Sequence, residues 1–142
     1  MTMRNEKRLS RYVRRAAAAV EMAVVAPLLL MMICGTIEFG WVFWIQETLT
    51  NATREGCRVA VLPGSTDTDI RNRFNTAVAP TGLSITSAML TLTHATTGNP
   101  VETVSVTIPR SQVSLLGNIS LIPGLTSGNI KASSSMRKEN MP

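Results

Sequence analysis

The main hydrophobic run of the chain covers residues 16–37, and Glu21 is the only charged residue within it. A helix of these 22 residues is long enough to cross the roughly 30 Å of hydrocarbon in a bilayer. Pro27 lies inside the run and predicts a kink, which a membrane helix tolerates because the freed carbonyl group can be satisfied locally. The pattern therefore predicts one transmembrane helix.

After the run, apolar positions recur at steps of three and four residues, which predicts that the helix continues with one apolar face. These positions are Trp41, Ile45, Leu49, Ala52, Gly56 and Val59. The polar side chains of Gln46, Glu47, Asn51, Arg54 and Arg58 fall on the opposite face. Pro63 and Gly64 end the helix. We expect its apolar face to belong to the core of a domain outside the membrane.

The rest of the chain predicts a short helix and an antiparallel sheet. Thr66 and Asp69 have capping-box spacing and begin a helix with an apolar face, which Pro80 and Gly82 end. Residues 83–94 and 101–108 alternate with β-branched side chains around a turn, as in a hairpin, and residues 130–136 predict a last strand. The fold class is therefore α+β: a long N-terminal helix and a small head with a short helix and two or three antiparallel strands.

Charge gives the orientation of the predicted span. The net charge of +5 arises entirely within residues 1–15, where six basic residues face only Glu6, so the rest of the chain is neutral. This distribution argues against a nucleic-acid-binding face. The positive-inside rule places the N-terminus in the cytoplasm and the head outside. Arg14 and Arg15 then lie at the inner membrane interface, and Trp41 and Trp44 lie at the outer one, where Glu38 is close enough to the surface to reach water.

No catalytic constellation, cofactor motif or metal-ligand spacing is apparent, so we expect no enzyme, cofactor or metal site. His94 is the only histidine and lies in a strand pattern, which favours a solvated or hydrogen-bonded side chain. Cys34 and Cys57 are too far apart along one helix to form a disulfide, and Cys57 is expected to pack the helix. A cleavable secretory signal fits poorly, because no small-x-small site follows the apolar run.

Glu21 is the feature that needs an explanation. A charged side chain inside a membrane costs on the order of 3 kcal/mol on insertion scales, and such residues mark functional sites. Arg14 and Arg15 are the only cations nearby and lie two helical turns away on roughly the same face. A contact in which these side chains snorkel towards each other is the structural alternative to a functional role.

Four sequence motifs follow one another in order: RRAAAAVEMA from Arg14, APLLL from Ala26, IEFG from Ile37 and LTNATREGCRVA from Leu49. The series covers roughly residues 14–62 and resembles type IV pilin-like proteins, specifically the TadE-like family of tight-adherence (Tad, or Flp) pilus systems. In that family a basic leader precedes small residues, a glutamate and an apolar helix. This sequence departs from the usual pattern at Ala16, where glycine is usual, and at Met22, where an aromatic residue is usual.

The resemblance implies that a prepilin peptidase cuts between Ala16 and Ala17 on the cytoplasmic side, with Glu21 at position five of the mature chain. The cut removes the +5 charge of the leader and frees the α-amine of Ala17. That amine can pair with Glu21 of a neighbouring subunit and set the register of assembly. The implied organisation is a leader over residues 1–16, a membrane and extended helix over 17–62, and an extracytoplasmic head over 63–142.

We therefore expect a non-enzymatic minor pilin or pseudopilin in a bacterial inner membrane, at the base of a pilus or within it. Its partners would be the prepilin peptidase, other pilin subunits and the assembly platform. Major pilins of such systems have little beyond the helix, so the head argues for a minor role. Two alternatives stay open: an unprocessed single-span protein whose outer head binds a partner, and a secreted soluble protein with an atypical signal.

Overall fold

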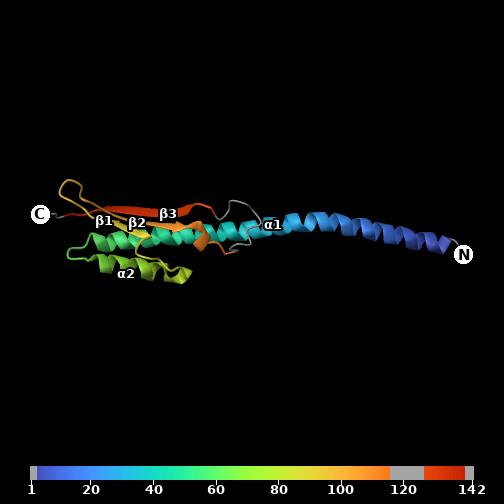
Figure 1. The fold of residues 1–142 in the computed structure, drawn as a ribbon, viewed down its shortest axis with the longest axis horizontal. Helices are drawn as coiled ribbons and strands as arrows, with labels where there is room; N and C mark the ends of the chain where they lie inside the picture. Colours follow the sequence, from blue (N-terminus) through green and yellow to red (C-terminus); the bar gives the residue numbers. More distant parts are fainter. Residues whose placement is uncertain (1–2, 116–126, 140–142) are drawn as a thin grey trace. The chain divides into compact units, whose positions relative to one another are not determined.

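A computed structural model describes residues 3–115 and 127–139, with side chains from residue 12 onward. The chain forms two compact units, Met1–Ile37 and Glu38–Pro142. Figure 1 shows the elements. They are the helices α1 (Met3–Ala60) and α2 (Asp67–Val78), the strands β1 (Leu90–Thr93), β2 (Val101–Pro109) and β3 (Asn129–Arg137), and the 3₁₀ turns η1 (Ala79–Thr81) and η2 (Arg110–Gln112). The α+β class predicted from the sequence is confirmed.

The three strands form one antiparallel sheet in the order β1-β2-β3. The predicted hairpin between β1 and β2 is present and closes with two hydrogen bonds between Thr96 and Asn99, of 2.8 and 2.9 Å. β1 is shorter than expected, because residues 83–86 have no regular structure and residues 87–89 form a turn, although the carbonyl of Met89 still accepts from the N–H of Thr107 at 2.9 Å. Their partner strand ends at Pro109, which has no N–H to donate to a longer ladder.

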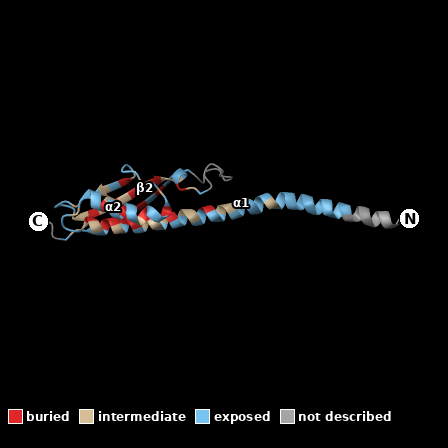
Figure 2. Cartoon of the chain, turned by 90° about the horizontal axis from the view of Figure 1, so that it is seen from below, coloured by how far each residue is buried: buried red, intermediate tan, exposed pale blue. Residues whose placement is uncertain are grey.

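The hydrophobic core lies where α2 and the inner face of the sheet pack on the second half of α1 (Figure 2). On α1 the predicted stripe is confirmed: Ile45, Leu49, Ala52 and Gly56 are buried. At Gly56 the helix lies close to both neighbours, since a Cβ built there would be in van der Waals contact with Val104 at 3.4 Å and with Ile70 at 3.7 Å.

α2 begins and ends as the sequence predicts. Thr66 and Asp69 form the capping box, in which each side chain bonds the backbone N–H of the other. The apolar face of α2 is buried through Ile70, Phe74 and Val78. Gly82 ends the following turn with a φ of +69°, a left-handed conformation that favours glycine.

Candidate functional site

The candidate site is the part of α1 that carries the predicted span. From residue 12 to residue 37 no side chain is buried, and apolar residues are exposed on all sides of the helix (Figure 2). The helix is long and apolar enough to cross a membrane by length and composition, and none of its most apolar window is buried against this chain. The core helix of a soluble domain would instead cover its apolar face. The segment is consistent with membrane anchoring.

Glu21 lies on this exposed segment, and its carboxylate makes no ion pair with any residue that the structure describes. In particular, no ion pair joins it to Arg14 or Arg15 in this structure. Pro27 lies inside α1 without ending it, and Ala16 and Ala17 also lie within the helix. Glu21 is therefore a single carboxylate on an otherwise apolar helical surface, one turn after Ala17.

The two tryptophans have different environments. Trp41 is half-buried, packs against the core, and donates a hydrogen bond of 2.7 Å from its indole Nε1 to the carbonyl of Val113. Trp44 is exposed, and its ring centroid lies 5.0 Å from that of Trp41. The structure thus gives Trp41 a partner inside the head, while the membrane-interface role of both residues stays a prediction.

Glu38 corrects the sequence analysis. It was expected to reach water at the outer interface, but it is only 3 % exposed and accepts a hydrogen bond of 3.2 Å from the backbone N–H of Leu115. A buried carboxylate is stable only where donors satisfy it. Glu38 therefore ties the segment after β2 to the start of the head, a contact between residues too distant in sequence for periodicity to reveal.

A second carboxylate that the sequence analysis did not single out is Glu102, whose side chain is 5 % exposed. Its two oxygens lie 3.2 Å from Nδ1 of His94 and 3.4 Å from Nζ of Lys138. His94 also places Nε2 3.1 Å from Asp67 at the start of α2, so it is a hydrogen-bonded histidine, as expected. The signal for Glu102 was its strand parity, since it alternates in phase with Val104 and the other buried residues of β2.

These contacts link the ends of five elements, α1, α2, β1, β2 and β3. Lys138 also donates to the carbonyl of Ala60, the last residue of α1, at 3.4 Å. Among the described residues, no group of three or more His, Cys, Asp or Glu side chains could hold a metal ion. Cys57 is buried and donates from Sγ to the carbonyl of Ser134 at 2.9 Å, which matches its predicted packing role.

Comparison with known proteins bears on α1. Neither curated proteins nor solved structures gave a significant match to the chain. The family model described as TadE-like protein matches residues 16–58, less than a third of the chain. The match begins at Ala16 and ends two residues before the end of α1. Over residues 16–58 this chain is therefore similar to the TadE-like family, which is the family that its motifs resemble.

Proposed function

We propose that this chain is a membrane-anchored minor pilin or pseudopilin of a Tad-type pilus. In this proposal the N-terminus faces the cytoplasm, the head lies outside the inner membrane, and a prepilin peptidase removes residues 1–16. The observation that carries the proposal is Glu21, a carboxylate on an apolar helical surface without an ion pair among the described residues. The TadE-like match over the same helix supports an association with a Tad pilus.

Glu21 would act through electrostatics. A carboxylate in hydrocarbon is costly alone, and an opposite charge in the same medium offsets that cost. After the cut, the new α-amine of Ala17 would be a cation four positions from Glu21, or it could face Glu21 of an adjacent subunit. The second arrangement would lower the free energy of two helices only when they pack in one register. Glu21 would thereby favour ordered assembly with pilin subunits.

The proposed cleavage bond lies inside α1, in a run of four alanines. Alanine is the residue that most favours a helix, whereas a protease cleft holds its substrate in extended form. The peptidase would therefore have to unwind about one turn before cutting. The helical conformation of the Ala16–Ala17 bond also favours the alternative function, an unprocessed single-span protein whose outer head binds a partner.

The functional test is Glu21→Ala, with Glu47→Ala as the matched control. Glu47 is also a carboxylate on α1, but it is exposed within the head unit and lies outside the apolar run. We expect Glu21→Ala to remain in the membrane fraction yet to lose co-purification with pilin subunits and to abolish pili. Glu47→Ala should behave like the wild type in both respects. Normal piliation with Glu21→Ala would contradict the proposed role of this carboxylate.

A further inference from the structure

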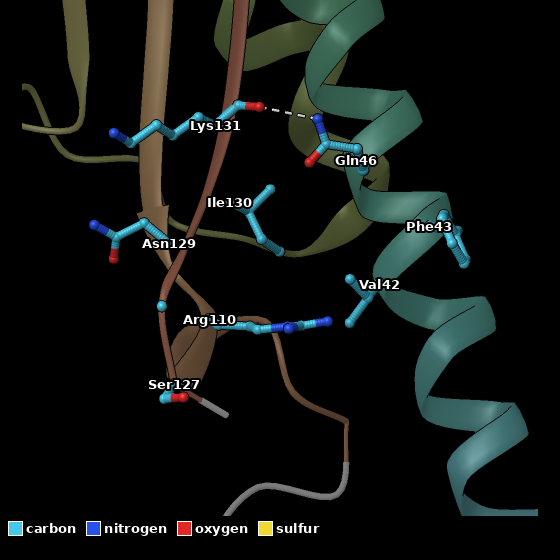
Figure 3. A pocket seen from close by; sticks show the side chains of 9 residues that line it. Val42, Phe43, Gln46, Arg110, Ser127, Asn129, Ile130 and Lys131 are labelled. Atoms are coloured by element: carbon cyan, nitrogen blue, oxygen red, sulfur yellow. Dashed lines mark hydrogen bonds between the residues drawn. The ribbon is translucent and has the colours of Figure 1, made fainter. Parts of the chain in front are cut away.

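A groove opens in the head beside the first turns of α1 that follow the apolar run (Figure 3). Val42, Phe43 and Gln46 of α1 form one side. The opposite side is formed by Arg110 after β2 and by residues 127–131, which lead into and begin β3. The volume is about 520 Å³, and no carboxylate is among the lining residues.

Arg110 is the only cation that points into this groove from the lining residues. Its guanidinium extends towards Val42, whereas the ammonium group of Lys131 points away from α1 (Figure 3). The backbone of Arg110 is held in place, because its N–H donates to Gly128 at 2.9 Å and its carbonyl accepts from Val113 at 3.0 Å. The side chain is therefore directed by the fold and not by a partner of its own.

That partner is missing within the described chain. The Nε atom of Arg110 is buried and has no hydrogen-bond acceptor among the residues that the structure describes. A buried donor without an acceptor is destabilising, and more so when it is charged. A guanidinium fits an oxyanion with two oxygens in one plane, such as a carboxylate or a phosphate. The groove thus has the chemistry of an anion site.

The position of the groove favours a lipid phosphate over a protein carboxylate. Val42 follows the last residue of the predicted span by five positions, about 8 Å of helix, which is the depth of the headgroup layer. The neighbouring aromatic residues of α1 are exposed: Phe39, Phe43 (70 %) and Trp44. Exposed aromatic rings are typical of a surface that contacts the membrane interface.

We propose that this groove binds the phosphate of an anionic phospholipid, with Arg110 as the anion-binding side chain and Val42 and Phe43 beside the glycerol and acyl chains. The inference rests on the membrane anchoring in the proposed function but not on cleavage or on Glu21. Bound lipid would fix the depth of the head at the membrane surface and supply the acceptor that Arg110 lacks.

The test is native mass spectrometry of the full chain in a neutral sugar detergent, with phosphatidylglycerol as the probe. Diacylglycerol with the same acyl chains lacks the phosphate and serves as the ligand control. We expect the wild type to retain phosphatidylglycerol but not diacylglycerol, and Arg110→Gln to weaken retention about tenfold or more. Lys131→Gln, the matched control on the same groove, should retain the lipid like the wild type.

Val42→Asp separates lost binding from lost folding, because it places a carboxylate where Arg110 points. This variant should lose the lipid while circular dichroism shows that the head stays folded, even though Val42 also packs against the core and its loss lowers the unfolding midpoint. Retention unchanged in Arg110→Gln, equal binding of diacylglycerol, or equal loss in Lys131→Gln would each overturn the proposal. Displacement of the lipid by millimolar inorganic phosphate would overturn it too, since it would indicate a free-phosphate site. All outcomes are independent of N-terminal processing.

Discussion

At the scale of single residues, Ser134 of β3 satisfies the polar groups on the buried face of α1. Its hydroxyl lies 2.9 Å from the hydroxyl of Thr53, and its carbonyl accepts from Cys57 at 2.9 Å. Thr53 and Cys57 are fully buried, so leaving either without a partner would cost about 1–3 kcal/mol. The Ser134 hydroxyl thus adds a second contact to Thr53, which also donates to the carbonyl of Thr50 at 2.8 Å, and the bond from Cys57 uses the backbone of β3.

Burial raises the pKa of the Cys57 thiol, an effect to which the nearby Glu102 carboxylate adds. The folded protein thus binds the thiol proton more tightly than the unfolded chain does. The resulting stability is fully present below the pKa of the unfolded thiol, about 9, and is lost as the pH rises through the higher folded value. We predict that iodoacetamide leaves Cys57 unmodified at neutral pH in a Cys34→Ser background until the protein unfolds.

The matched variant for this prediction is Cys57→Ser, which keeps a donor to Ser134 but does not ionise in this range. Thermal unfolding midpoints measured between pH 7 and pH 10 should fall less for Cys57→Ser than for the parent. Rapid alkylation of Cys57 in the folded state would show that the thiol is not buried as described.

At the scale of elements, an ion pair joins α2 to α1, and a capping box begins α2. Arg73 of α2 donates to Glu55 of α1 at 2.8 Å, and this hydrogen bond is the main reason why the pKa of Glu55 is lowered. The capping hydrogen bonds from Thr66 likewise lower the pKa of Asp69. At pH values above their ordinary pKa values, both carboxylates stabilise the fold. This stabilisation is lost as the pH falls through the lowered pKa values of the folded state.

Thr66→Ala removes the side-chain cap of α2 and should lower the free energy of unfolding by about 1 kcal/mol. Thr66→Ser keeps the hydroxyl and should be close to neutral. Urea unfolding of the full chain in detergent, followed by circular dichroism, measures both. Equal stability of the alanine and serine variants at pH 7 would mean that the cap contributes nothing, whatever its geometry.

The elements themselves could be predicted because their signals are local. The capping box at Thr66, the stripe on α1 and the turn at residues 96–99 each depend on neighbours a few positions away. Strand parity indicates that Glu102 is buried, but the partners of Glu38 and Glu102 and the groove at Arg110 could not be predicted in the same way. Glu38 bonds to Leu115, which is 77 residues away, and Glu102 bonds to Lys138, which is 36 residues away. The groove at Arg110 exists only once β3 returns to α1.

At the scale of the whole molecule, each of the two units has its own role in the proposed function. Residues 12–37 expose apolar side chains and one carboxylate, and the head buries its core around the second half of α1. In the proposed function, the first unit would anchor the chain and register it against other subunits. The head would add the groove at Arg110 and a surface for partners. The proposed register role of the first unit depends on which N-terminus the protein carries in its native membrane, whereas the role of the groove at Arg110 does not.

The most direct test of this account is the intact mass and N-terminal sequence of the protein isolated from membranes of its native host. The account predicts a mature chain that begins at Ala17, with the new α-amine four positions before Glu21. A variant with a bulky residue at Ala16, such as Ala16→Phe, should keep the full-length mass and lose assembly. A wild-type chain that still begins at Met1 would contradict the account and favour an unprocessed, anchored protein.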